Sequence, residues 1–285
     1  MSNNDFYIGW MPKAPGSFAR HTKKVIIALL ILAVTVGVLL ATAQKKFSTG
    51  QFEFGRLTNI TGVYFKEPVP AIKVMSGKDL LGRASYITIP LIGYGKFGAG
   101  GIILDLEKEK HLDLVKKEIT LKGTLLYNDG KLLMQIDAAD DPLVSVNKAA
   151  GENILPLQKE LGEQTILGEI VDPKCFFGVM KPGEGKPHKD CAIRCISGGI
   201  PPVLKVINNE GEANYYLLMG AQGEKMNQAV KEFVAAPVAV KAKVVKYDDW
   251  VILYVTDKKS ISPVSARQLI KPGSQTIGCI APCLK

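Results

Sequence analysis

The chain has 285 residues, 47% of them hydrophobic, and a formal net charge of +9 at pH 7. This length allows two modest domains and a membrane segment, and the apolar content is enough for a packed core. The 28 glycines and 16 prolines argue against a mainly helical protein. Some of the positive charge lies beside a membrane segment, so the charge alone is weak evidence for nucleic-acid binding.

An uncharged apolar run extends from Val25 to Ala43. It is long enough to cross a bilayer as a helix, which takes about 20 residues. Two basic residues, Lys45 and Lys46, follow it at once. Four others precede it: Lys13, Arg20, Lys23 and Lys24. The positive-inside rule then predicts a cytoplasmic segment over 1–24, a transmembrane helix over 25–43 and an extracytoplasmic bulk.

Two features of the N-terminal region leave alternatives open. Ala41-Thr42-Ala43 resembles the cleavage site of a signal peptide, although the long polar segment and the long apolar run favour an uncleaved anchor. Tyr7 and Trp10 suit the membrane interface, where aromatic rings gather, and could equally dock against a neighbouring membrane subunit.

The remainder of the chain shows the same order of elements twice: three strands, a helix, and a two-strand hairpin. In the first copy these are 54–65, 70–75, 86–93, the helix 104–118 and the hairpin 119–137. In the second copy they are 165–172, 201–208, 215–220, the helix 223–234 and the hairpin 238–257. Such a repeat indicates a duplicated domain rather than a solenoid unit.

Five strands with a helix between the third and fourth is the order of an OB-fold, a small barrel. The sequence therefore predicts a mainly β protein with two tandem OB-fold-like five-stranded barrels behind one transmembrane helix, and a pair of generic β-sandwiches is the alternative. The expected boundaries are 44–137 for the first OB-like domain, 138–163 for a linker, 164–260 for the second OB-like domain and 261–285 for a C-terminal tail.

A long insert, residues 174–200, joins the first two strands of the second copy, where the first copy has only a few residues. Pro187 and Gly198 fit the start and end of a short helix. On that helix His188, Cys191 and Cys195 fall on one face, and Cys175 could close over it. These are ligands for zinc, copper or iron. Met180 is an extra candidate ligand for copper.

The spacing of these ligands, C-x12-H-x2-C-x3-C, matches no standard zinc or iron–sulfur pattern, and the chain has no C-x-x-C for a thioredoxin-like pair or c-type haem. Structural disulfides are an alternative, since cysteines outside the cytoplasm usually pair. Cys279 and Cys283 could bond to each other or to the insert. A reactive thiol is the third interpretation of the insert.

The motif in and around this insert resembles a recurring module of exported bacterial proteins, with the pattern GEIVDxxC, then HxxCAxxC, then GxP. The matching positions are Gly168, Asp172, Cys175, His188, Cys191, Ala192, Cys195, Gly199 and Pro201. The module is uncharacterised, so the resemblance implies an exported OB-like domain and no activity. It covers only the C-terminal copy.

Other patterns carry less chemistry. The glycine-rich run 93–101 lacks the spacing of a phosphate-binding loop and is interpreted as a flexible turn. His111 lies in a charged helical stretch and His21 lies beside the apolar run, so no Ser-His-Asp arrangement is evident. Nucleic-acid binding is not expected, since an extracytoplasmic location would remove the substrate.

Two hypotheses of different classes follow. The first is a non-enzymatic, single-pass membrane protein that acts as an accessory or assembly subunit of a membrane complex, a respiratory or electron-transfer complex among the candidates. The second is a metal- or cofactor-binding redox protein that uses Cys175, His188, Cys191 and Cys195.

Overall fold

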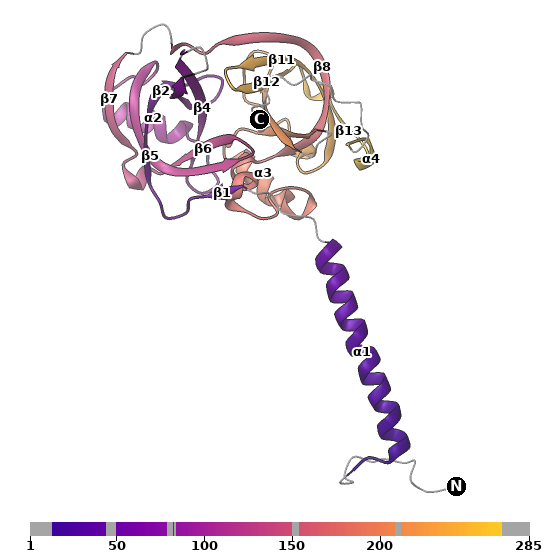
Figure 1. The fold of residues 1–285 in the computed structure, drawn as a ribbon. Coiled ribbons are helices and arrows are strands. Elements are labelled where there is room, and N and C mark those ends of the chain that lie inside the picture. The colour runs from indigo at the N-terminus through magenta and orange to yellow at the C-terminus, as the bar shows by residue number, and fades with distance from the viewer. Residues whose placement is uncertain are drawn as a thin grey trace. The chain divides into compact units, whose positions relative to one another are not determined.

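The computed structural model describes residues 13–43, 50–78, 82, 84–149, 154–208 and 212–269 (Figure 1). The chain divides into two compact units, Met1–Phe47 and Ser48–Lys285. The first unit contains helix α1 (Gly16–Ala43), so the helix begins before the apolar run and includes polar residues. Its segment Phe18–Ala43 is long and apolar enough to cross a membrane, a property that N-terminal signal sequences share.

The second unit begins with a closed five-stranded barrel. Its strands are β2 (Thr58–Phe65), β3 (Ala71–Lys78), β4 (Ala84–Gly93), β5 (Lys117–Asn128) and β6 (Lys131–Ile136). Strands β2 to β4 pair in order, β4 pairs with β6 in parallel, and β6 and β2 both pair with β5. Helix α2 (Gly100–Glu109) lies between β4 and β5. Two further strands, β1 (Gln51–Phe52) and β7 (Leu143–Ala149), pair with β5.

A second barrel repeats this pattern. Its strands are β8 (Gln158–Val171), β9 (Val203–Ile207), β10 (Ala213–Gly220), β11 (Pro237–Tyr247) and β12 (Trp250–Val255). Strand β10 pairs with β12 in parallel, and β11 closes the barrel between β12 and β8. Strand β13 (Ile261–Pro263) pairs with the start of β11 in antiparallel orientation and is followed by helix α4 (Ala266–Leu269). The predicted fold of two five-stranded barrels behind an N-terminal helix is confirmed.

The predicted helices of the two barrels are only partly right. In the first barrel α2 starts at Gly100, inside the glycine-rich run, and ends before His111, whose φ of 51° cannot continue a helix. In the second barrel the predicted helix 223–234 is wrong, because the segment forms only a short 3-10 helix, η6 (Lys231–Phe233). Residues near the middle and at the end of this segment make contacts outside it. The Asn227 side chain donates to Ile196 O and Ile200 O, and Val234 forms a β-bridge with Ile170.

The predicted linker 138–163 also contains more structure than expected. Residues Leu143–Ala149 form β7, because Leu143 is buried and the segment pairs along β5. Strand β8 already begins at Gln158. The tail is ordered as β13 and α4 up to Leu269, and residues 270–285 lie outside the described residues.

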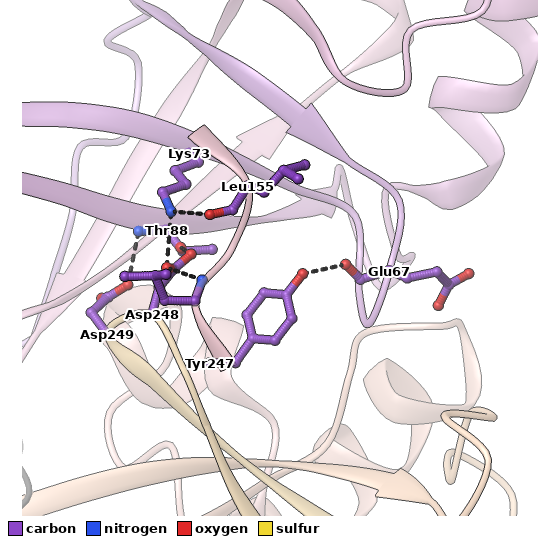
Figure 2. A network of polar contacts seen from close by, with 8 residues as sticks. Glu67, Lys73, Thr88, Leu155, Tyr247, Asp248 and Asp249 are labelled. Atoms are coloured by element: carbon purple, nitrogen blue, oxygen red, sulfur yellow. Dashed lines mark hydrogen bonds and ion pairs between the residues drawn. The ribbon is translucent and has the colours of Figure 1, made fainter. Parts of the chain in front are cut away.

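The hairpin turn of the second barrel inserts against the first barrel (Figure 2). The Asp248 carboxylate pairs with Lys73 Nζ at 2.9 Å, and Asp249 accepts a hydrogen bond from Thr88 N at 2.9 Å. The Trp250 indole N–H donates to Thr88 O, also at 2.9 Å. Lys73 and Asp248 are both buried, so the ion pair is shielded from water.

The hairpin turn of the first barrel makes the reciprocal contact with β10. Asn128 Nδ2 donates to the Tyr215 hydroxyl at 3.0 Å, and that hydroxyl donates to Asp129. Thr88 in β4 and Tyr215 in β10 occupy the same position relative to Gly93 and Gly220, which end their strands. Each barrel therefore contacts the other through its own hairpin.

Candidate metal centre

The insert begins directly at the end of β8. Residues Cys175–Val179 form a short π-helix, η4, in which Cys175, Phe176 and Phe177 are buried. The rings of Phe176 and Phe177 pack against Tyr215, with centroids 5.6 and 4.8 Å apart respectively. Aromatic burial on this scale is a large apolar contribution, so the Cys175 side chain is held by a packed core and does not lie on a free loop.

The predicted short helix of the insert is present. A 3-10 turn, η5 (Lys186–His188), leads into helix α3 (Lys189–Ser197), with His188 at the N-cap position. Ala192 and Ile196 pack into the core of the second barrel, while Cys195 packs into a core formed by both barrels. The apolar side of α3 thus fixes how its polar and thiol side chains are presented.

Five side chains between the end of β8 and α3 form two overlapping groups of potential metal ligands. Cys175, His188 and Cys191 form the first group, in which the ligand atoms all lie within 4.8 Å of one another. Asp172, Cys175 and Cys195 form the second group by the same criterion. The sequence had suggested that four ligands converge on one point. The structure instead divides them into two groups, which share Cys175, and adds Asp172.

Both groups contain a buried polar atom without a hydrogen-bond partner. His188 is 2% exposed and its Nε2 has no partner, while Asp172 is fully buried and its Oδ2 has none. The other carboxylate oxygen, Asp172 Oδ1, accepts a hydrogen bond from Lys174 N at 2.9 Å. A buried polar atom left unpaired costs about 1–3 kcal/mol. Both unpaired atoms are of a kind that coordinates metal ions.

The electrostatics of the site favour the uncharged forms of Cys175 and His188. A hydrogen bond with Cys195, burial and the negative charge of Asp172 raise the pKa of the Cys175 thiol. Burial lowers the pKa of His188. The positive charge of Lys96 lowers it further, while the negative charge of Asp172 raises it in part. Neutral imidazole is the form that binds metals, whereas a thiol must first lose its proton.

Lys96 is a member of the site that the sequence did not indicate. Its ammonium group lies 2.9 Å from Cys191 Sγ and 3.9 Å from Cys195 Sγ. The hydrogen bond with Cys191 is the main reason that the pKa of Lys96 is raised. Lys96 comes from the first barrel, so the thiols of α3 lie where the two barrels meet.

The loop that carries Lys96 is part of the glycine-rich run interpreted as a flexible turn. The turn is present after β4, but it packs tightly on the end of α3. A Cβ on Gly98 would lie 2.2 Å from Gly199 O, and one on Gly198 would lie 1.9 Å from Lys96 O. Gly98 N donates to Gly198 O at 3.1 Å. The glycines are the sequence feature from which this close approach could have been inferred.

A second lysine holds the same loop from inside. Lys174 Nζ donates to Gly93 O at 2.8 Å and to Gly95 O at 2.7 Å. Lys174 is 3% exposed, and burial lowers its pKa. Because its ammonium group is bonded to these carbonyls, Lys174 fixes the loop over the site.

The other predicted site residues do not join this cluster in the described part of the chain. Met180 lies just after η4 with its side chain 45% exposed. Cys175, Cys191 and Cys195 carry free thiols, so no disulfide links these three. Cys279, Cys283, Tyr7 and Trp10 lie outside the described residues.

No protein-family model and no curated protein matches this chain. The resemblance of the Cys/His pattern to an exported module therefore stays a prediction, and the chemistry of the site has to be inferred from the residues themselves.

Proposed function

We propose that this chain is a membrane-anchored protein that binds a thiophilic metal ion through Cys175, His188 and Cys191. The observation that supports this most directly is the first ligand group: two sulfur atoms and an imidazole nitrogen within 4.8 Å of one another. The unpaired Nε2 of buried His188 adds to it, because a metal ion would satisfy that atom.

The donor set suits Zn²⁺ best among the candidate ions. Zinc favours thiolate and imidazole ligands and four-coordinate geometry, and three protein ligands leave one coordination position open. Copper and iron are the alternative outcomes of a metal analysis. Cys191 is the one ligand of this group that is partly exposed, so we expect ions to enter on its side, next to Lys96.

The full chain purified in mild detergent under reducing conditions tests this proposal. After chelation and reconstitution with Zn²⁺, elemental analysis should find stoichiometric zinc in the wild type and a loss in Cys191→Ser. Met180→Ser is the matched control and should keep its zinc, because Met180 lies in the same insert but is exposed and belongs to neither ligand group. A wild type that takes up no zinc, copper or iron, or a Cys191→Ser variant that binds as much as the wild type, would overturn the proposal.

We further propose that α1 anchors the barrels outside the cytoplasm and that the chain is a non-enzymatic accessory subunit of a membrane complex. Tyr94 and Phe97, which lie in the same loop as Lys96, are 60% and 65% exposed. Exposed aromatic side chains around a functional site are typical of docking surfaces. Purification in mild detergent should bring down defined partners that are lost in Phe97→Ser. A monomeric wild-type protein would contradict this role.

A further inference from the structure

The two ligand groups overlap in a single residue, Cys175. Its sulfur lies within 4.8 Å of the ligand atoms of His188 and Cys191 in the first group, and of those of Asp172 and Cys195 in the second. A single ion does not have to contact all five side chains, because the two groups have only the Cys175 thiol in common. A thiolate sulfur has several lone pairs, so it can coordinate two ions at once.

Each group also has its own buried unpaired atom. His188, whose Nε2 is unpaired, belongs to the first group, and Asp172, whose Oδ2 is unpaired, belongs to the second. An ion in the first group alone would leave Asp172 Oδ2 without a partner in the core. Lys174 does not supply one: its ammonium group donates to Gly93 O and Gly95 O, and no hydrogen bond joins it to Asp172 Oδ2.

From this arrangement we infer that the centre takes two metal ions bridged by the Cys175 thiolate. This inference rests on the proposed function and extends it. The first ion is held by Cys175, His188 and Cys191, and the second by Asp172, Cys175 and Cys195. Both sets are combinations of sulfur, nitrogen and oxygen ligands that zinc-class ions accept. Known two-metal sites place their ions about 3.5–4 Å apart, a spacing that one shared sulfur can span.

The ligands of such a centre match the charge of its two ions. Three thiolates and one carboxylate carry four negative charges, and two divalent ions carry four positive charges. Two lysines add positive charge nearby. Lys96 lies at the partly exposed edge beside Cys191, where water can solvate its charge, and the ammonium group of buried Lys174 is solvated by Gly93 O and Gly95 O. With one divalent ion in the first group, Lys174 would offset the charge of Asp172, but Asp172 Oδ2 would still have no hydrogen-bond partner.

Metal stoichiometry on the reduced full chain in detergent tests the inference. Titration with Zn²⁺ against a competing chelator should give two ions in the wild type, one in Asp172→Asn, one in His188→Gln and fewer than one in Cys175→Ser. Glu169→Gln is the control: Glu169 accepts a hydrogen bond from Gly185 N in the same insert but belongs to neither group, so this variant should keep two ions.

Titration of the wild type with Co²⁺ adds a readout that needs no variant. Two Co²⁺ ions that share a thiolate are magnetically coupled, so the electron paramagnetic resonance signal should fall when the second equivalent binds. One ion in the wild type and in Asp172→Asn would overturn the two-ion centre and leave the proposed function standing. No bound ion would overturn both. Two ions with additive, uncoupled signals would overturn the bridging role of Cys175.

Discussion

The buried ion pair between the barrels gives a quantitative test of how the two domains are held together. Lys73 Nζ lies 2.9 Å from Asp248 Oδ1, and the two side chains are 3% and 7% exposed. Replacing Lys73 with Met keeps the apolar stem and removes the charge. Asp248 then stays buried as a carboxylate, with hydrogen bonds only from Leu157 N and the Thr88 hydroxyl.

Removal of one partner from a buried pair costs about 3–5 kcal/mol, because the remaining charge loses its counter-ion away from water. We expect Lys73→Met to fall near the lower end, about 3 kcal/mol, since two hydrogen bonds to Asp248 remain. The matched control is Lys243→Met. Lys243 pairs with Glu160 at 2.8 Å, but these side chains are 49% and 61% exposed. An exposed pair contributes at most about 1 kcal/mol.

Urea unfolding of the full chain in detergent, followed by tryptophan fluorescence in a Trp10→Phe background, measures both variants. Trp250 is 1% exposed and donates to Thr88 O, so its emission reports directly on the contact between the barrels. Lys73→Met should lower the unfolding midpoint well below that of Lys243→Met. If the two variants differ by less than about 1 kcal/mol, the reasoning on this pair is refuted.

Two further predictions concern the site. In thermal melts and zinc titrations, Gly98→Ala should destabilise the chain by about 1–3 kcal/mol and weaken zinc binding, because the new Cβ would lie 2.2 Å from Gly199 O. The control is Gly100→Ala at the start of α2, where a Cβ has open space around it. This variant should be neutral or stabilising in both assays. The metal-free chain should lose stability as the pH falls below about 6.5, the ordinary pKa of histidine, and the loss should end at the lower folded-state pKa of His188. Between these two pKa values the imidazole binds a proton in the unfolded chain and not in the folded one. The unfolding midpoint of His188→Gln should therefore change less between pH 7 and 5 than that of the wild type. Equal changes in the midpoint for variant and wild type would contradict this.

The sequence by itself determined the features that depend on local patterns. The uncharged run after Lys24 predicts an apolar helix, and alternating Val, Ile and Leu predict the strands and their OB-like order. Pro187 and Gly198 place α3 within two residues of its observed start and one residue of its observed end. These features are encoded in periodicity, length and turn residues over a few neighbouring positions, so the sequence shows them directly.

Only the tertiary structure decided which side chains meet at the metal centre. Lys96 reaches Cys191 from the other barrel, and the grouping of Asp172 with Cys195 depends on how α3 packs on β8. The failed helix prediction at 223–234 has the same cause, since Asn227 bonds to the end of α3 and Val234 to Ile170. Contacts between residues far apart in the chain follow from how elements pack, and no local pattern encodes that packing.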